Sequence, residues 1–200
     1  MDFKSSMRVK PTHQFLNHAE GEATPASATL RLGVVDYLNM QPLTAGLEVA
    51  FGEALRLRHG TPSQLAGWLE QAAIDVGMVP VASLMAHPEW RIVAAPAGGS
   101  MIGARGAVMS VLALGGGPAQ GWRRLRPDSH SMTSNVLARV ILERKYGLSL
   151  ELAEPIPPEG WEPPREGVPG EATVLIGSRA LRWRNWTGGP IKGLGREWGE

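Results

Sequence analysis

The stretch LGVVDYLNMQPL, residues 32–43, places polar side chains between a buried strand and the start of a helix. Its apolar strand is followed by Asp36, Tyr37 and Asn39, and Pro42 suits the first turn of a helix, where a missing N–H costs nothing. In open α/β sheets, ligands bind outside the carboxyl ends of the strands. The stretch therefore predicts an α/β fold with a binding crevice at this strand end.

The composition narrows the class of protein. The 200 residues can form one domain or two small lobes around a real core. A formal net charge of +1 does not favour nucleic acid as a partner. The chain has no cysteine, which excludes disulfides and thiolate metal sites, and its five histidines lack metal-ligand spacing. We therefore predict no metal and no cofactor.

Residues 1–28 are mixed and polar, without the continuous apolar stretch of a secretory signal. No apolar run in the sequence approaches the roughly eighteen residues that a membrane span needs. We interpret this segment as a disordered extension, or as the product of a start codon placed too early. We accordingly expect a cytoplasmic protein without a membrane partner.

Strands and helices alternate along the rest of the chain. Strands are predicted at 29–35, 54–60, 74–80, 91–96, 106–115, 148–154 and 172–178. Helices are predicted at 42–52, 61–72, 81–89 and 130–148. Such alternation predicts parallel or mixed sheets with flanking helices.

Two of these helices carry clear signals. Thr61 is expected to be the N-cap of its helix, with Gln64 completing a capping box. The helix over 130–148 is the strongest in the chain, and Gly147 suits its C-terminal end. Its apolar face is predicted to consist of Val136, Leu137, Val140 and Ile141.

Three segments between these elements are interpreted as irregular or exposed. Residues 155–171 contain six prolines in seventeen residues, which predicts an exposed, partly polyproline-like loop. The basic run WRRLRP, residues 122–127, is typical of a solvated face. The three glycines at 115–117 lack the spacing of a phosphate-binding loop and predict a turn.

Polar side chains gather at successive strand ends and helix starts. The segments concerned are 36–39, 60–63, 80–83, and Ser129, Ser131, Thr133 and Ser134. Helix N-termini add unpaired N–H groups and a positive dipole end, which suit a carboxylate or phosphate. Taken singly, Thr61 and one hydroxyl at 131–134 have an alternative as N-caps, Asn39 as a turn residue, and Ser110 as a buried hydroxyl. Together these groups predict a site for a small anion.

Five motifs occur in an order that points to one enzyme family. They are YLNMQPL (37–43), GTPSQL (60–65), IDVGMVPVASL (74–84), MTSNVLARVILERKYGL (132–148) and VLIGSRAL (174–181). The set resembles chorismate dehydratase of the futalosine route of menaquinone biosynthesis. The resemblance covers roughly residues 30–198.

The resemblance implies the two-lobed fold of type II periplasmic binding proteins, with the ligand in the cleft between the lobes. Lobe one is then expected at 29–108 and lobe two at 109–190, and residues 191–200 start the return to lobe one. Family members continue beyond this length, so we expect a C-terminal truncation in which the closing part of lobe one is missing. An open sheet edge and an uncovered apolar face would then favour self-association.

The chemistry that the resemblance implies is a hydro-lyase reaction, in which chorismate loses water to give 3-(1-carboxyvinyloxy)benzoate. Asn39 and Ser110 match the family's catalytic positions. The matching substrate-binding positions are Tyr37, Thr61, Ser83, Ser131, Thr133 and Ser134. A neutral amide such as Asn39 does not accept a proton to a useful extent, so the proton acceptor is either the substrate's own carboxylate or Asp36.

The sequence also departs from the family pattern. Ala104-Arg105-Gly106 stands where the family has Ser-Asp-Gly, Ala82 replaces a serine, and Gly193-Leu194-Gly195 replaces Asp-Leu-Gly. These changes leave two alternatives to the dehydratase: a non-catalytic small-anion binding module and an inactive, truncated remnant. The fold alone does not separate them, because function depends on the site.

Overall fold

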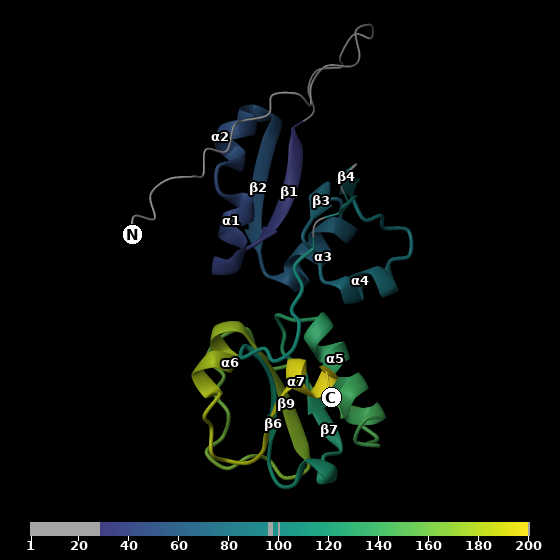
Figure 1. Ribbon diagram of the computed structural model, residues 1–200, viewed down its shortest axis with the longest axis vertical. Helices are drawn as coiled ribbons and strands as arrows, with labels where there is room; N and C mark the ends of the chain where they lie inside the picture. The colour runs from purple at the N-terminus through teal and green to yellow at the C-terminus, as the bar shows by residue number, and fades with distance from the viewer. Residues whose placement is uncertain (1–28, 96–97, 100, 200) are drawn as a thin grey trace, which may run out of the picture.

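The computed structural model describes residues 29–95, 98–99 and 101–199, and two sheets lie one above the other along its long axis (Figure 1). The three-stranded sheet is parallel, in the order β2-β1-β3, and consists of β1 (Leu30–Val35), β2 (Leu55–Gly60) and β3 (Val76–Gly77). A short antiparallel pair follows, formed by β4 (Ala94–Ala95) and β5 (Gly98–Gly99). The predicted α/β class with flanking helices is therefore confirmed.

The second sheet has five strands in the order β10-β6-β9-β7-β8. They are β6 (Val111–Gly115), β7 (Arg124–Arg126), β8 (Glu151–Leu152), β9 (Glu171–Ile176) and β10 (Ile191–Gly193). β7 runs parallel to both β8 and β9, whereas β6 is antiparallel to β9 and to β10. This sheet is mixed, as the sequence predicts.

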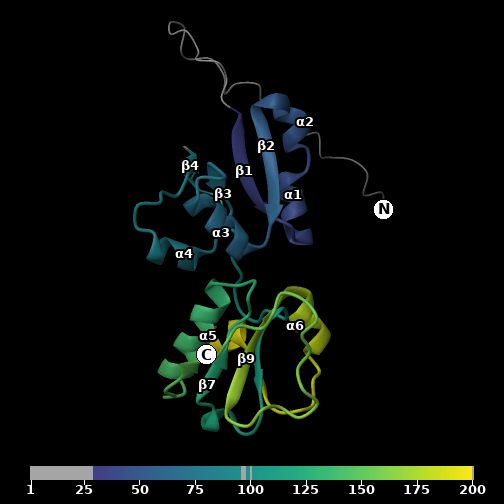
Figure 2. The same ribbon diagram turned by 180° about the vertical axis from the view of Figure 1, so that it is seen from behind.

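The prediction of one helix from Pro42 to Gly52 is wrong in one respect, because the structure has two short helices there instead of one. The structure has α1 (Gln41–Thr44) and α2 (Leu47–Phe51), flanked by the 3-10 turns η1 (Leu38–Met40) and η2 (Gly52–Ala54). Gly46 adopts a left-handed conformation with φ of 83°, which interrupts the helical hydrogen bonds. Both views show α1 and α2 on the side of β2 away from α3 (Figures 1 and 2).

The helix α3 (Pro62–Glu70) begins as predicted. The Thr61 hydroxyl accepts a hydrogen bond from the Gln64 N–H at 3.3 Å, and the Thr61 N–H donates to the Gln64 side chain at 2.9 Å. Leu65 is fully buried against the sheet. The helix ends earlier than the predicted residue 72, because it stops at Glu70 and Ala72 has a positive φ and is exposed.

The strand β3 is much shorter than the predicted 74–80, and an ion pair fixes its start. The Arg31 guanidinium on β1 donates to the Asp75 carboxylate, and the Arg31 N–H donates to the same group at 2.8 Å. These hydrogen bonds from Arg31 lower the pKa of Asp75 to about 2. The short helix α4 (Val81–Ala86) follows with Pro80 as its N-cap.

Helices cover both faces of the five-stranded sheet, and a separate buried cluster lies on each face. The face covered by α5 (Thr133–Arg144) buries Ala113, Trp122, Leu125, Ala138, Ile141, Leu142, Ala172 and Val174. The face covered by α6 (Gly177–Trp183) buries Leu112, Leu114, Ile156, Leu175 and Ala180. The result is a three-layer unit with β6 and β9 at its centre.

The basic run at 122–127 is a solvated face only in part: Arg123 and Arg124 are exposed, as predicted, but the run also contributes a core strand. Trp122 and Leu125 are fully buried, and residues 124–126 form β7. Trp122 directly follows the 3-10 turn η3 (Ala119–Gly121), and its indole N–H donates to the Gly116 carbonyl at 3.1 Å. The arginines conceal the strand pattern because only one apolar residue lies between them.

The buried face of α5 matches the prediction in part: Ile141 is buried and Leu137 packs against the core cluster, as predicted. Ala138, Ile141 and Leu142 are buried, whereas Val136 and Val140 are exposed at 45% and 37%. The helix is therefore rotated relative to the expected face, with small Ala138 allowing close approach to the sheet. Gly147 has a positive φ of 65°, as expected for a residue after a helix end.

The proline-rich segment 155–171 is irregular, as predicted, but it is not simply exposed. Ile156 is fully buried, and Trp161 packs on the cluster that α6 covers. The predicted glycine turn at 115–117 is confirmed only at its end: Gly115 closes β6 and Gly116 bridges to Pro169, whereas Gly117 has a φ of 69°.

Residues 191–199 differ from the expected return to lobe one. β10 pairs with β6 at the edge of the five-stranded sheet, and α7 (Leu194–Gly199) packs against α5. Glu197 on α7 accepts a hydrogen bond from Tyr146 at 2.6 Å and lies 3.1 Å from the Lys145 ammonium and 3.5 Å from that of Lys192. This polar cluster connects α7 to the end of α5 and to β10.

Within the described part of the chain, the helices are all too short or too polar to cross a membrane. The prediction about residues 1–28 lies outside the described residues.

Candidate functional site

We call the region where α4 contacts the start of α5 the junction, and we define it by Tyr37, Ser83, Asp128, Thr133 and Arg179. The first turn of α4 contacts the start of α5 there. The Ala82 N–H lies 3.4 Å from the Thr133 hydroxyl oxygen, and the Ser83 hydroxyl donates to the Met132 sulfur at 3.4 Å. Ser83 is fully buried in this contact.

Tyr37 reaches the junction from the end of β1. It is the N-cap of η1 with an extended backbone, and the residue is 37% exposed. Burial raises the pKa of the Tyr37 hydroxyl, the charge of Asp128 raises it further, and the charge of Arg179 opposes these effects. Tyr37 therefore lies within charge range of two groups from the other sheet, and its hydroxyl stays protonated at neutral pH.

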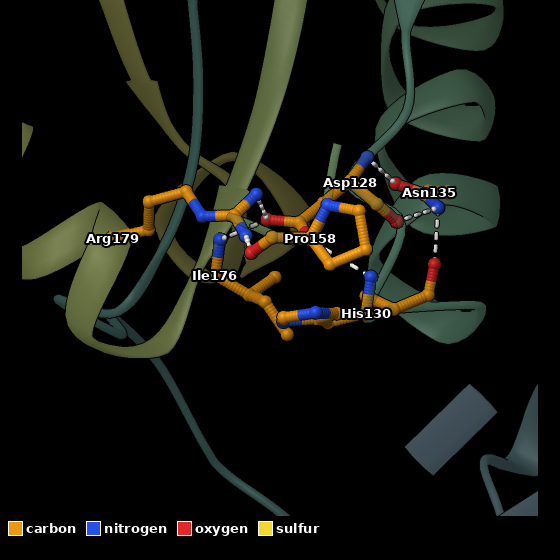
Figure 3. A network of polar contacts seen from close by, with 7 residues as sticks. Asp128, His130, Asn135, Pro158, Ile176 and Arg179 are labelled. Carbon is orange, nitrogen blue, oxygen red and sulfur yellow. Dashed lines mark hydrogen bonds and ion pairs between the residues drawn. The ribbon is translucent and has the colours of Figure 1, made fainter. Parts of the chain in front are cut away.

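Asp128 is the centre of the polar network at the junction (Figure 3). It follows β7 and is only 1% exposed. One carboxylate oxygen accepts the His130 N–H at 2.9 Å, and the other accepts the Ile176 N–H at 3.1 Å. Asp128 thus joins the turn before α5 to the end of β9, where α6 begins.

Asn135 fixes the backbone of Asp128 from the first turns of α5. Its side-chain oxygen accepts the Asp128 N–H, and its side-chain nitrogen donates to the Asp128 carbonyl, both at 2.9 Å. The same nitrogen also donates to the Ser131 carbonyl. Because an amide carries both donors and acceptors, Asn135 satisfies three backbone groups of this turn at once.

Arg179 extends from α6 toward Asp128. Its Nη1 lies 3.7 Å from a carboxylate oxygen of Asp128, and its Nη2 donates to the Pro158 carbonyl at 2.5 Å. The side chain is 16% exposed. Among the described residues, the buried Nη1 finds no hydrogen-bond acceptor.

The hydroxyls that open α5 are already engaged with the backbone. The Ser131 hydroxyl accepts the Ser134 N–H at 3.1 Å, which is the N-capping alternative considered for this segment. The Thr133 hydroxyl accepts a hydrogen bond from the N–H of Ala82, which belongs to α4 beside the three-stranded sheet. The structure therefore brings Ser131, Thr133 and Ser134 to the junction together with Ser83 and Tyr37.

Three other predicted site residues belong to other elements. Asn39 is exposed within η1, two residues from Tyr37. Thr61 acts as the N-cap of α3, so its hydroxyl serves the capping box. Ser110 precedes β6 instead of lying inside a strand, and its carbonyl accepts the Gly177 N–H at 2.9 Å, beside the start of α6.

A cavity of about 310 Å³ lies beside the junction, between β2 and the helices α1 and α2. Tyr37 belongs to its lining, together with Gln41 and His59. Asp36 and Glu48 also line it, and the Asp36 carboxylate lies 3.9 Å from the His59 ring. These two carboxylates would repel an anionic ligand.

A second cavity of about 310 Å³ lies beneath the proline-rich segment, lined by Trp161 and Trp186 among others. Arg126 and Glu171, which also line it, are already paired at 2.8 Å. The Trp186 indole N–H donates to the Pro164 carbonyl at 3.0 Å. The charged and indole groups that line this second cavity are thus already paired with other groups of the protein.

Sequence reasoning missed Asp128 and Arg179. Asp128 follows β7, a strand that the sequence did not reveal. Arg179 stands inside the VLIGSRAL motif, and an ionisable residue in the first turn after a buried strand was the available signal. No group of three metal-ligating side chains is found among residues 29–95, 98–99 and 101–199.

Clefts where α/β sheets adjoin are common places for small molecules to bind. The chain matches the family model described as menaquinone biosynthesis over residues 30–200, and it belongs to that family. Membership of a biosynthetic family indicates an enzymatic role. Comparison with curated proteins gives no match.

Proposed function

We propose that this protein is a chorismate dehydratase, a hydro-lyase that converts chorismate to 3-(1-carboxyvinyloxy)benzoate and water. The observation that carries the proposal is the family match over residues 30–200, which places the chain in menaquinone biosynthesis. The motifs at 37–43 and 60–65 favour this reaction within the pathway. We further propose that the two sheets belong to two lobes of a type II periplasmic-binding-protein-like fold, with the substrate at the junction.

The reaction needs little from the protein beyond positioning. A ring hydrogen and the ring hydroxyl leave together as water, and the ring becomes aromatic. No electrons are gained or lost, so neither an oxidant nor a reductant is required. Holding the substrate in one orientation and managing a single proton therefore account for the catalysis.

The junction offers groups suited to a substrate with two carboxylates. The N-terminus of α5 presents the positive end of a helix dipole. Tyr37 supplies a protonated hydroxyl, since its pKa is raised. Asn39 orients the substrate or stabilises developing charge, and Ser110 lies next to the start of α6.

The proton acceptor in this proposal is the substrate's own enolpyruvyl carboxylate, held near the ring by the protein. The alternative acceptor is Asp36. Its side chain is 80% exposed and lies near His59, so it lacks the burial that commonly adapts a carboxylate to act as a general base. Exchange of Asp36 for Asn separates the two, because only a direct base role makes the carboxylate essential.

The proposal is tested by incubating the purified chain with chorismate. We expect the absorbance to change as the ring becomes aromatic, and mass spectrometry to show a product lighter by one water. Asn39→Ala should lower kcat by about 10²- to 10³-fold, the usual cost of losing a positioned polar group that stabilises charge. Asp36→Asn should retain most of the activity.

Two results would contradict the proposal. Binding of chorismate without turnover would favour the non-catalytic binding module instead. Full activity in Asn39→Ala would show that this side chain is not beside the reacting ring. The replacement of the family's acidic residue by Arg105, which is exposed here, is the specific observation that keeps the binding module as the second candidate.

A further inference from the structure

Arg179 is a charged side chain whose hydrogen-bonding capacity is not used up. Its Nη1 is buried, and among the described residues it has no hydrogen-bond acceptor. The nearest charge, Asp128, lies 3.7 Å away, beyond hydrogen-bonding distance. An unsatisfied donor on a buried cation is costly, so such a group in a folded protein calls for an explanation.

Asp128 alone does not explain Arg179. Both carboxylate oxygens of Asp128 already accept backbone N–H groups, from His130 and Ile176. Its structural task of joining β7, β9 and α5 is thus complete without the arginine. The ion pair instead holds the guanidinium in place, together with the bond from Nη2 to the Pro158 carbonyl (Figure 3).

The location of Arg179 gives the guanidinium a second role. Its ion-pair partner Asp128 binds the N–H of His130 in the turn before α5, and the start of α5 contacts α4, so the guanidinium lies at the end of the five-stranded sheet that faces the three-stranded one. The side chain as a whole is 16% exposed, whereas the Nη1 atom itself is buried. The guanidinium is thus held at Nη2 and lacks an acceptor at Nη1, and its planar fork of donors is the group that matches a carboxylate.

We propose that Arg179 is the carboxylate-binding residue of the junction, positioned by Asp128 and by the Pro158 carbonyl. It anchors a carboxylate of an aromatic or cyclohexadiene dicarboxylate, and it acts in binding and not in the chemical step. The choice of a dicarboxylate rests on the proposed function. The anchoring role itself rests on the unsatisfied donor, its confinement and its place between the sheets.

The test measures the binding of isophthalate, an aromatic meta-dicarboxylate, and of its neutral diamide by isothermal titration calorimetry. We expect Arg179→Ala to weaken isophthalate binding by about 10- to 100-fold, the cost of a lost charge-assisted hydrogen bond. The weaker binding of the diamide should not change. Arg179→Lys should recover part of the loss, because it restores the charge but not the planar fork.

With chorismate, Arg179→Ala should raise KM by a similar factor and leave kcat within about threefold, the pattern expected when an anchor acts equally before and during the reaction. A purely structural role would instead lower the melting temperature and the active fraction, with KM unchanged. Arg182→Ala is the matched control, since Arg182 is exposed on the same helix and should leave every value unchanged.

The outcomes separate the anchor from the proposed function. If the wild-type protein converts chorismate and Arg179→Ala leaves KM and isophthalate binding unchanged, the anchor is overturned and the dehydratase stands. If chorismate is not converted but isophthalate binds in an Arg179-dependent way, the dehydratase fails and the anchor stands. If the wild-type protein binds neither compound, both are overturned.

Discussion

The two sheets of this protein differ in how completely they are packed. The five-stranded sheet buries apolar side chains on both faces, with Trp122, Leu125 and Leu175 fully enclosed. Around the three-stranded sheet, Val49 and Leu38 are 91% and 83% exposed. From this difference we infer that the packing of the five-stranded sheet contributes most of the free energy of unfolding. That sheet also holds the rigid network around the candidate site, and the three-stranded sheet contributes Tyr37.

The largest effect should come from the core of the five-stranded sheet. Trp122→Ala should lower the free energy of unfolding by about 3–5 kcal/mol, because it empties a fully buried site and leaves the Gly116 carbonyl without its donor. Urea unfolding followed by circular dichroism measures the change. The control is Trp198→Ala, whose side chain is 65% exposed; equal losses in the two variants would refute the packing difference.

A smaller effect is expected where α7 docks onto the same sheet. Burial alone would raise the pKa of Glu197, but hydrogen bonds from Tyr146 and Lys145 and the charges of Lys192 and Lys145 outweigh it and hold the pKa below its ordinary value. Glu197→Gln should cost about 1–2 kcal/mol at pH 7, between the values typical of exposed and of buried pairs.

The pH dependence of this cost has a definite sign. A carboxyl group with a lowered pKa in the folded state stabilises it above the pKa of the unfolded chain, and this stabilisation disappears as the pH falls through the folded-state value. The difference between wild type and Glu197→Gln should therefore shrink below about pH 4.5, the ordinary pKa of the group. Glu143→Gln, which breaks an exposed pair with Arg139, should show little of this behaviour.

At the three-stranded sheet, substitution of Thr61 tests whether its hydroxyl caps α3 or binds the substrate. Thr61→Ala should lower the free energy of unfolding by about 1 kcal/mol through loss of the capping box, and Thr61→Ser should retain the stability. Thermal unfolding and the KM for chorismate are measured together. An unchanged stability with a raised KM would assign the hydroxyl to the substrate instead of the helix.

The smallest effect is expected on the exposed side of α2. Val49→Ser should change the free energy of unfolding by no more than about 0.5 kcal/mol, because the side chain has almost no contacts to lose. Chemical unfolding beside the wild type measures this. A loss of 2 kcal/mol or more would mean that Val49 is covered in solution, and the contrast between the sheets would then be smaller than described.

Much of the fold could be predicted from the sequence. The strand at 29–35 and the capped start of α3 carried local signals, and both were found. β7 was missed because two arginines flank its single core residue, Leu125. The rotation of α5 was missed because Ala138, a small residue, marks the true contact face better than Val136 and Val140 do.

The site could be predicted only in part. Strand ends and helix starts pointed to Tyr37, Ser83 and Thr133, which the structure brings to the junction. Asp128 and Arg179 were not foreseen because their pairing joins residues 51 positions apart, through a turn and a helix start whose relative placement is a tertiary property. Local pattern contains no information on such a distance.

The central claim is that the substrate binds at the junction, and hydrogen–deuterium exchange with and without saturating chorismate tests it directly. The account predicts slower exchange in peptides covering residues 36–40, 81–84, 128–134 and 176–180, and no change in residues 161–168, which border the tryptophan-lined cavity. Slower exchange confined to residues 161–168, with the junction peptides unchanged, would contradict it.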